Sequence, residues 1–589
     1  MTRGSAAGPT AQQTDRRGDT RRRLIVSVVF IPVTIVLLRP TPDNLNHTLT
    51  NLGDPSIYGW SLSWSTHVLA SHPTTVFQAP IFWPHPDTLA YTDSLLVLSL
   101  PFALVRALGG SWALAVNLIT IGIILFSLGA TYALIRRLVG RTDAAVFGAI
   151  AFTYSSYSFG HIGHVHLLLL GQFSLGFLLT FRLFRRPRLR EGLWLGLLNI
   201  TVCAGSLYYA LAWALCLGTA VGIWLIGTRV RPGRQFWSAM LTMVVVSLLA
   251  VPILIPYARL SADRPLIPEW AIKASDAITV APGSYLYPGL DHHASTRPLR
   301  SEHSFFPGFS TAVLALGGIV VLVQVRRKRP GDQRGAPRDD EPNSSGTRFR
   351  QLEIWIVLAA AAVNMAIAIG PEIRGHTMPF TWLHGHAPAF GGIRATARFA
   401  IPALLALSVL AAVGYAELAR RLRSRTAAVV AVVLVAFLVL ELAAPLTHVR
   451  VPEDAPTLAV YRALHRRGPG ATAELPMENP AVDGPAWSYV EAVRMLYATL
   501  DWHPRVNGQS GGWPDDYIKN VVDINQYPGP VGVAATRRLR VRYLILHTGH
   551  TAGFPQYTRA QVRRILRRLP PSARAHRYGN AWLIDLGHQ

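Results

Sequence analysis

The fold of this 589-residue chain is decided first by residues 24–38, LIVSVVFIPVTIVLL, an unbroken apolar stretch near the N-terminus. Similar windows of about 16 to 23 residues recur along the chain, long enough to cross the roughly 30 Å hydrocarbon layer as helices. The windows are continuous rather than alternating, so they predict helices and not the strands of a barrel. No small-residue cleavage site follows the first window, which we interpret as a retained anchor.

The charge of the chain is arranged around these windows. Half of the residues are hydrophobic, 15% are charged, and the formal net charge is +25. Most of the arginine clusters separate two apolar windows; they fall at residues 16–23, 136–141, 182–190, 229–234, 326–350 and 420–425. This positive-inside pattern places these clusters on the cytoplasmic side of a plasma membrane. Membrane orientation therefore accounts for much of the charge, and we predict no nucleic-acid partner.

With the N-terminus inside, about eleven transmembrane helices satisfy this pattern. The predicted spans are 24–39, 113–135, 143–160, 165–183, 192–207, 208–228, 236–257, 308–326, 352–370, 398–419 and 427–446. The segment 94–110 is also apolar, but a crossing there would turn the cluster at 136–141 outward. It carries Pro101 and Arg106, and we expect it to be an interfacial or re-entrant helix in contact with membrane lipid.

The predicted fold class is an α-helical polytopic membrane protein with a C-terminal external α/β domain. The predicted parts are a cytoplasmic basic tail at 1–23, a transmembrane domain at 24–446 with external loops at 40–112, 258–307 and 371–397, a disordered cytoplasmic linker at 328–350, and an external soluble domain at 447–589. In the last part, strand-like pieces such as VRYLILHTG (541–549) alternate with helical patterns such as TRAQVRRILRRL (558–569). That alternation predicts the α/β architecture.

Few titratable and aromatic side chains lie near the predicted outer surface, and these are the candidate site residues. In chain order, the candidates are Asp54, Tyr58, Trp60, His161, His164, Arg259, Arg264, Glu302, Arg394 and Arg398. The first three belong to NLGDPSIYGWSLSW (51–64), directly after the first span. The two last arginines are four residues apart, which predicts one shared helical face at the outer end of a span.

Several patches of the chain carry a family resemblance. They are GDPSIYGWSLSW (53–64), FQAPIFWPHPDTLAYTDSLL (77–96), GHVHLLLLGQFSLGFLL (163–179), GIRATARFAIPALLALSVLAAVGY (392–415) and RVNGQSGGWPDDY (505–517). With these patches the chain resembles the GT-C glycosyltransferases, in particular the dolichyl-phosphate-mannose mannosyltransferase-like and YfhO-like bacterial membrane proteins. The first loop of that superfamily often carries two neighbouring acidic residues, whereas this chain has Asp54 followed by Pro55.

The resemblance implies transfer of a sugar from a polyprenyl-phosphate donor to a hydroxyl of a cell-envelope glycan, lipid or protein. Such a transfer, with inversion, needs a base for the acceptor proton and positive charge at the departing phosphate. Asp54 is the predicted base. Arg394 and Arg398 are the first candidates for the phosphate, because a guanidinium presents a planar fork of donors, and Arg259 and Arg264 are the second.

The remaining candidates have substrate-binding roles in this hypothesis. Glu302 is a predicted acceptor-side contact, and His161 and His164 are predicted to contact substrate or phosphate. Together with His166 they could also hold a divalent ion. Neutral imidazoles with local hydrogen bonds are the commoner outcome of such a cluster, so we predict no metal site and leave the cofactor unassigned.

Each candidate also has a simpler interpretation. Asp54 before a proline can start a turn or cap the next helix. Arg394 and Arg398 can extend toward lipid headgroups without chemistry. Tyr58 and Trp60 can belong to an interfacial aromatic belt rather than stack on a sugar.

Two other functional classes remain open from the sequence. A lipid-linked sugar transporter or flippase would bury ionisable residues in the middle of its helices, and Glu417 and Glu441 are the main ones inside the predicted spans. A non-catalytic membrane scaffold with an external binding domain is the other class. A cavity that holds both a carboxylate and an arginine favours the transferase over the scaffold.

Overall fold

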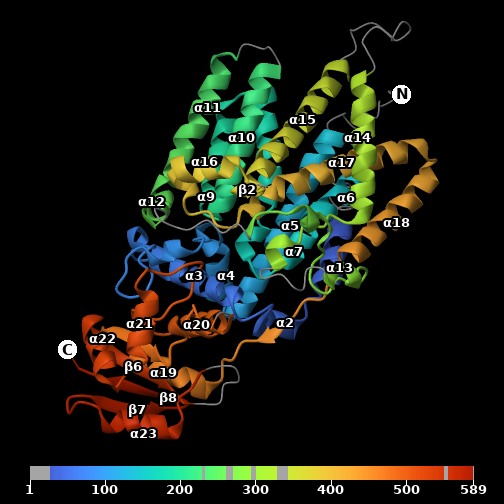
Figure 1. Ribbon diagram of the computed structural model, residues 1–589. Coiled ribbons are helices and arrows are strands. Elements are labelled where there is room, and N and C mark those ends of the chain that lie inside the picture. Colours follow the sequence, from blue (N-terminus) through green and yellow to red (C-terminus); the bar gives the residue numbers. More distant parts are fainter. Residues whose placement is uncertain are drawn as a thin grey trace, which may run out of the picture.

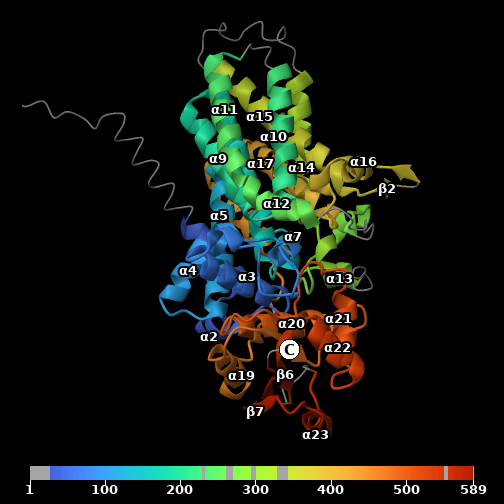
Figure 2. The ribbon, with the colours of Figure 1, turned by 90° about the vertical axis from the view of Figure 1, so that its left-hand side faces the viewer.

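The structure is a computed structural model that describes residues 27–227, 232–260, 270–292, 300–327, 343–373, 375–483, 485–548 and 555–587. Long helices form a bundle at one end of the molecule, and a part that contains a β-sheet lies at the other end (Figure 1). Helices of the first predicted loop lie between these two parts in both views (Figures 1 and 2).

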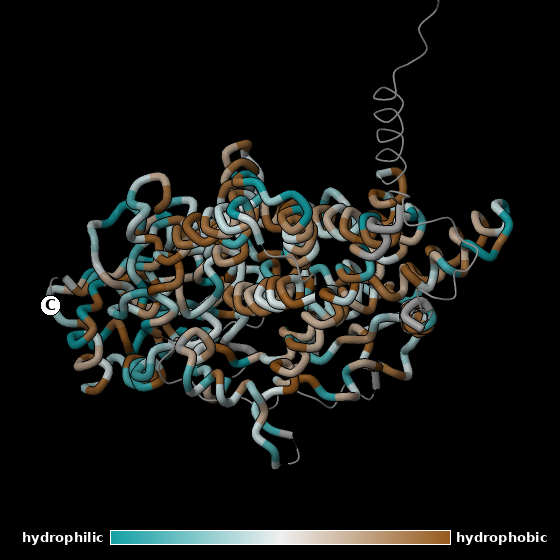
Figure 3. The backbone as a smooth tube through the Cα atoms, turned by 90° about the horizontal axis from the view of Figure 1, so that it is seen from above, coloured by the Kyte–Doolittle hydropathy of each residue, from teal (hydrophilic) through white to brown (hydrophobic). Residues whose placement is uncertain are grey.

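The bundle is assembled from apolar helices, and the tube shows many brown, hydrophobic stretches (Figure 3). They are α5 (Trp112–Val139), α6 (Thr142–Thr153), α7 (Ser156–Gly160), α8 (Gly171–Arg185), α9 (Leu189–Cys203), α10 (Leu207–Gly227), α11 (Arg234–Ser247), α12 (Val251–Leu260), α14 (Phe309–Arg327), α15 (Asn343–Ala368), α17 (Ile401–Arg421) and α18 (Ser424–Leu442). Within the described ranges, seven helical segments are long and apolar enough to cross a membrane. The predicted polytopic membrane architecture is confirmed.

These seven segments correspond to seven of the eleven predicted spans. The other four predicted spans, 24–39, 143–160, 192–207 and 308–326, are also helical. In the described residues, the helices at the first three are shorter than the seven segments or broken, whereas the last is the continuous helix α14. The second of them is divided into α6 and α7, because Ser155 between them has a non-helical backbone (φ −53°, ψ 159°). Hydropathy alone does not register such a break.

The predicted linker at 328–350 is corrected at its C-terminal end. Residues 343–350 form the first turns of α15, which continues to Ala368. Residues 328–342, and the predicted tail at 1–23, lie outside the described residues.

Two glycine contacts explain how closely the bundle helices pack. A Cβ added at Gly318 of α14 would lie 2.1 Å from the carbonyl oxygen of Leu410 in α17, and one at Gly414 would lie 2.0 Å from that of Leu314. The two backbones are therefore in direct contact, as is usual where small residues face each other in membrane helices. This packing holds α17 in place, and with it the chain segment that precedes α17.

The segments between the long helices contain short elements. The first predicted loop holds α2 (Pro42–His47), β1 (Thr48–Leu49), α3 (Asp54–Leu69), η1 (Pro73–Thr75), η2 (Thr88–Tyr91), η3 (Leu96–Leu98) and α4 (Ser99–Ala107). Elsewhere there are η4 (Val165–Leu168), η5 (Leu248–Ala250), η7 (Ala274–Ile278), α13 (Pro288–His292), η8 (Arg300–His303), β2 (Glu372–Ile373), β3 (His376–Thr377), α16 (Pro379–His386), η9 (Pro388–Phe390) and η10 (Thr396–Ala400). Together, these elements position the candidate site.

The C-terminal part has the predicted α/β character. Its elements are β4 (Val449–Arg450), α19 (Ala455–His465), β5 (Ala471–Leu475), α20 (Pro485–Ala498), α21 (Tyr517–Ile524), α22 (Pro530–Arg538), β6 (Val541–His547), α23 (Arg559–Arg567), β7 (Arg574–Tyr578) and β8 (Ala581–Asp585). Four strands form one sheet in the order β5-β6-β8-β7, in which only β5 and β6 are parallel. β5 is buried along its whole length, and β6 along most of it.

Backbone hydrogen bonds attach the C-terminal part to the first loop. β4 pairs with β1 in an antiparallel register. Farther along, the amide of Phe82 donates to the carbonyl of Asn507 at 3.1 Å, and the amide of Arg505 donates to the carbonyl of Pro80 at 3.1 Å. The chain that follows Asn507 is thereby held next to the helices of the first loop.

Candidate active site

A cavity of about 210 Å³ lies where the first loop, the bundle and the C-terminal part meet. Its polar and aromatic walls come from segments far apart in the sequence. They include Asp54, Tyr58, Asp93, His164, His166, Tyr208, Trp270, Glu302, Arg394, Arg398 and Gly511.

Asp54 is placed by the start of α3. It is the first residue of that helix, where free backbone amides favour a negative charge. Its side chain is 36% exposed, and its Oδ2 lies 3.0 Å from Nε2 of His164. Burial raises the pKa of Asp54, but the attraction of His164 and, more weakly, of Arg398 outweighs burial and holds the pKa below its ordinary value. Asp54 is therefore ionised at neutral pH.

Arg398 is held by a buried carboxylate. From η10 it donates two hydrogen bonds to Glu302 of η8, one of them from Nε at 3.1 Å, and its guanidinium lies 4.5 Å from the centre of the Tyr208 ring. Burial raises the pKa of Glu302, but the charge of Arg398 and the neighbouring His161 outweigh it and hold the pKa well below its ordinary value. Glu302 is therefore the counter-ion of Arg398.

His161 supports Glu302 from behind the cavity. It is fully buried, its Nε2 lies 3.3 Å from the Glu302 carboxylate, and its Nδ1 lies 2.9 Å from the carbonyl oxygen of Tyr157. Burial lowers the pKa of His161, and the Glu302 carboxylate acts in the opposite direction. His161 is not among the residues that line the cavity, whereas His164 is.

Arg394 differs from Arg398 because it has no carboxylate partner among the residues that the structure describes. It donates from Nη2 to the carbonyl oxygen of Gly511, and its guanidinium lies 5.1 Å from the centre of the Trp270 ring. Its Nε is buried without a hydrogen-bond partner. A guanidinium in this state can bind an anion that enters the cavity.

The predicted geometry of the two arginines is wrong, although both line the cavity. Arg394 lies in the irregular segment before η10 and Arg398 lies within η10, so they do not share an α-helical face. Both border the cavity. α17, which follows η10, packs closely against α14, and Arg394 donates to the carbonyl oxygen of Gly511 in the C-terminal part.

A second acid–histidine pair borders the cavity. Asp93 accepts hydrogen bonds from the amide of Leu207 at 2.8 Å and from the hydroxyl of Ser206 at 3.1 Å, and its Oδ2 lies 3.1 Å from Nε2 of His166. Burial raises the pKa of Asp93. Asp93 thus connects the first loop to the start of α10. The sequence offers little sign of this connection, because its partners lie far along the chain.

Besides His161, two predicted site residues, Trp60 and Arg259, do not line the cavity. Trp60 is 1% exposed within α3, so it is a core side chain and not a sugar platform or a belt residue. Arg259 is 66% exposed and donates to Asp87 at 3.2 Å. Arg264 lies outside the described residues. Tyr58 does line the cavity, next to Asp54, and burial raises its pKa.

The acids and histidines of the site are paired one to one. Asp54 faces His164, Asp93 faces His166, and Glu302 faces His161. In the described part of the chain, no group of three or more His, Cys, Asp or Glu side chains is arranged to hold a metal ion. The geometry offers a carboxylate base and cationic groups.

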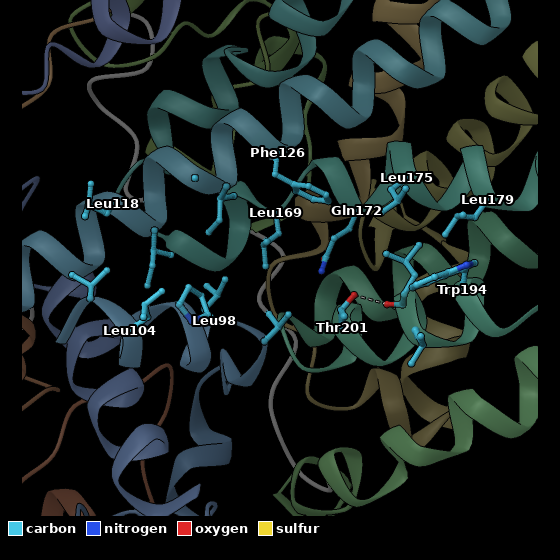
Figure 4. Close-up of a pocket in the computed structure, with 18 of the residues that line it drawn as sticks. Leu98, Leu104, Leu118, Phe126, Leu169, Gln172, Leu175, Leu179, Trp194 and Thr201 are labelled. Carbon is cyan, nitrogen blue, oxygen red and sulfur yellow. Dashed lines mark hydrogen bonds between the residues drawn. The ribbon is translucent and has the colours of Figure 1, made fainter. Parts of the chain in front are cut away.

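An apolar groove of about 700 Å³ runs beside the site between α4, α5, α8 and α9 (Figure 4). Leu104, Leu118, Phe126, Leu179 and Trp194 are among the side chains that point into it (Figure 4). The groove and the cavity share three pieces of chain, because Asp93, His166 and Leu207 line the cavity and Val97, Leu169 and Thr201 line the groove. An apolar chain in the groove would thus end near the cavity.

The solved structures that resemble this chain share its fold at low sequence identity. Residues 25–442 match the model of a family described as "Domain of unknown function (DUF6311)". No curated protein matches the chain. Among solved structures, arabinofuranosyltransferase AftD from Mycobacteria is 15% identical, with a TM-score of 0.58, over 97% of this chain and 40% of that chain.

Two other structures are similar at lower scores. The Archaeoglobus fulgidus oligosaccharyltransferase is 13% identical over 89% of this chain and 68% of that chain, with a TM-score of 0.48. ArnT from Cupriavidus metallidurans is 11% identical over 97% of this chain and 98% of that chain, with a TM-score of 0.36. The chain spans 40% of the length of AftD, and the likeness to it shows the fold. The protein has the GT-C fold that its sequence predicts.

Proposed function

The chain belongs to the DUF6311 family, and from its GT-C fold and its site we propose that it is a membrane glycosyltransferase. The proposed reaction moves one sugar from a polyprenyl-phosphate donor to an acceptor hydroxyl on the extracytoplasmic face, with inversion at the anomeric carbon. A single observation carries the proposal: the ionised carboxylate of Asp54 lines the same cavity as the guanidinium of Arg394, which has no carboxylate partner among the described residues.

The residues of the site have distinct roles in this reaction. Asp54 takes the proton of the acceptor hydroxyl while the oxygen forms a bond to the anomeric carbon. The bond from that carbon to the phosphate oxygen breaks, and the electron pair leaves with the polyprenyl phosphate. Arg394 binds the departing phosphate and Arg398 adds positive potential, since both guanidinium groups line the cavity. A single displacement of this kind inverts the anomeric configuration.

His164 and Glu302 position the charged groups. His164 lies at Oδ2 of Asp54 and leaves Oδ1 without a hydrogen bond to any described residue. Oδ1 is therefore the oxygen available for the acceptor proton. Glu302 keeps Arg398 at the cavity wall through two hydrogen bonds. In this proposal Glu302 has that positioning role, and its acceptor contact stays a prediction.

The apolar groove supports a lipid-linked donor. Its walls are almost entirely apolar, and its volume of about 700 Å³ is more than three times that of the site cavity. Burial of an isoprenoid chain there contributes about 25 cal/mol per Å² of apolar surface. The donor in this proposal places its hydrocarbon in the groove and its phosphate at Arg394.

The transporter alternative has less support in the described part of the chain. Glu441 accepts hydrogen bonds from the amides of Phe309 and Ser310 and so caps α14, and Glu417 pairs with Arg420 and Arg421 at the end of α17. Both acids thus have structural partners and do not mark a route through the bundle.

The proposal is tested with purified full-length protein and radiolabelled donors. Wild type is offered polyprenyl-monophosphate hexoses and pentoses, with nucleotide sugars and polyprenyl-pyrophosphate sugars as matched controls. We expect transfer from at least one monophosphate donor and a product of inverted anomeric configuration by NMR. Transfer from nucleotide sugars alone, or a product of retained configuration, would contradict the proposal.

A further inference from the structure

A second cavity, of about 310 Å³, shares Asp54 and His164 with the site cavity. It is formed by the turn before α3, the hairpin after α7, the start of η8 and the first residues of α20. Its other lining residues are Thr50, Asn51, Gly53, Gly160, Ile162, Gly163, Ser301, Thr447, Ser488 and Tyr489. Asp54 and His164 therefore form a partition that is accessible from two cavities.

The two cavities differ in their charges. The site cavity is bordered by Arg394 and Arg398 in addition to its acids. The second cavity has no ionisable lining side chain apart from the shared pair and the phenol of Tyr489, and no cation among its other described walls. An anionic group placed there would lose hydration and face the Asp54 carboxylate without a compensating charge. The second cavity therefore suits an uncharged ligand.

The polar groups of the second cavity are free to bind such a ligand. The amide nitrogen of Asn51 and the hydroxyl groups of Ser301 and Tyr489 have no hydrogen-bond partner among the residues that the structure describes. The hydroxyl of Ser488 accepts a hydrogen bond from Gln509 at 3.1 Å. Hydroxyl and amide groups can both donate to and accept from the hydroxyls of a sugar.

Glycines keep the space next to the partition open. A Cβ added at Gly163 would lie 2.9 Å from the amide nitrogen of Asn51. A Cβ added at Gly53 would lie 3.4 Å from the Ser488 hydroxyl and 3.4 Å from the Tyr489 ring. These two glycines directly precede His164 and Asp54, so the chain reaches the partition without filling the second cavity.

We propose that the second cavity is the acceptor subsite and that it selects an uncharged, polyhydroxylated acceptor, a neutral glycan. This inference rests on the proposed function. The acceptor hydroxyl approaches Asp54 from the second cavity while the sugar to be transferred occupies the site cavity on the other side. Its proton passes to Asp54, its oxygen bonds to the anomeric carbon, and the polyprenyl phosphate leaves toward Arg394.

The first test measures binding, so that it does not depend on transfer. Saturation-transfer NMR is recorded on the full-length protein with methyl hexopyranosides and methyl pentofuranosides, and with the matching methyl uronosides. We expect signal from at least one neutral glycoside, at least tenfold weaker binding of its uronoside counterpart, and loss of signal in Ser488→Trp, which fills the cavity. Equal binding of neutral and acidic glycosides, or unchanged binding in Ser488→Trp, would overturn the inference.

The second test measures transfer with a milder variant. Tyr489 is 45% exposed, so Tyr489→Ala should fold normally; Tyr285, 47% exposed and outside both cavities, is the matched control as Tyr285→Ala. Loss of one hydrogen bond should raise the acceptor KM about 2- to 10-fold in Tyr489→Ala, with the donor KM unchanged. A rise in donor KM alone, or equal effects of the two variants, would contradict the acceptor subsite.

The two proposals fail in distinguishable ways. If wild type transfers no sugar from any polyprenyl monophosphate, the proposed function fails whatever the glycosides bind. If wild type transfers sugar but Tyr489→Ala and Ser488→Trp keep the wild-type acceptor KM, only the acceptor subsite fails. Preference for an acceptor that carries phosphate or carboxylate would also overturn the inference.

Discussion

The described part of the chain has a buried arginine–carboxylate network at the candidate site and another in the C-terminal part. At the site, Arg398 pairs with Glu302. In the C-terminal part, Arg505 pairs with Glu474 and Asp501, and all three side chains are almost fully buried. By charge and burial alone the two networks look equivalent.

They differ in what remains available for a ligand. Each guanidinium nitrogen of Arg505 donates to Glu474, Asp501 or the carbonyl of His503. At the site, Arg398 and Glu302 border a cavity, with Arg394 and Asp54 beside them. Buried ion pairs are therefore not in themselves a sign of function; the sign is a charged group that the protein leaves incompletely bonded at a cavity.

The largest expected effect is on stability, in the C-terminal network. Arg505→Met leaves Glu474 and Asp501 buried without their cation, and breaking such a buried pair costs about 3–5 kcal/mol. Thermal unfolding of the purified protein in detergent measures the loss. A melting temperature within a degree of wild type would show that the network is not a structural core.

The next effect is on activity, in the site network. Arg398→Gln removes positive charge next to the departing phosphate and should lower kcat for transfer by roughly 10²–10³. Its destabilisation should be smaller than that of Arg505→Met, because Glu302 remains next to a cavity and can be hydrated. Equal stability losses in the two variants, with kcat unchanged in Arg398→Gln, would remove the distinction between the networks.

A pH-dependent effect distinguishes two acids within the C-terminal network. Burial raises the pKa of Glu491 to about 7, despite the nearby Arg494. For Glu474, a hydrogen bond from His547 and the charge of Arg505 outweigh burial and lower the pKa to about 2. Because the folded state holds the Glu491 proton more tightly than the unfolded chain does, stability should fall as pH rises from about 4.5 to 7. Since one unit of pKa shift corresponds to 1.36 kcal/mol, the full loss in the free energy of unfolding is about 3 kcal/mol.

Glu491→Gln tests this pH dependence. The amide cannot ionise, so the fall in melting temperature between pH 4.5 and 7 should be largely absent in the variant. A slope as steep as that of wild type would assign the pH dependence to other groups.

The smallest expected effect concerns the shape of the cation at the phosphate. Arg394→Lys keeps the charge but loses the planar fork, and we expect the donor KM to rise about tenfold. Arg259→Lys is the matched control, because Arg259 pairs with Asp87 outside the cavity. Similar donor KM values for both variants would indicate that Arg394 does not bind the phosphate.

Much of the fold could be predicted from the sequence, because apolar length and arginine clusters are local signals. The polytopic helical architecture followed from them. The α/β character of the C-terminal part followed from its alternation of strand-like and helical patterns, and the likeness to the GT-C fold came from the family resemblance. The break at Ser155 and the burial of Trp60 could not be predicted, since both depend on packing against distant segments. Hydropathy also does not separate a helix that spans a bilayer from a shorter one such as α9.

The sequence predicted which residues line the candidate site better than it predicted the contacts between those residues. Asp54, Arg394 and Arg398 do line one cavity. The pairing of Arg398 with Glu302 joins residues 96 positions apart, and the contact of Arg394 with Gly511 joins residues 117 positions apart. Such contacts follow from bundle packing and from the docking of the C-terminal part, which no local pattern encodes. For the same reason, Arg259 could not be separated from the true lining residues.

The central claim is that Asp54 removes the acceptor proton, and a single-turnover measurement tests it most directly. The donor is bound first, acceptor is added, and the transfer rate of Asp54→Asn is compared with wild type and with Asp43→Asn, which changes an exposed aspartate of α2. The account predicts that Asp54→Asn binds donor normally but transfers roughly 10²–10⁴ times more slowly, while Asp43→Asn equals wild type. A wild-type transfer rate in Asp54→Asn would contradict it.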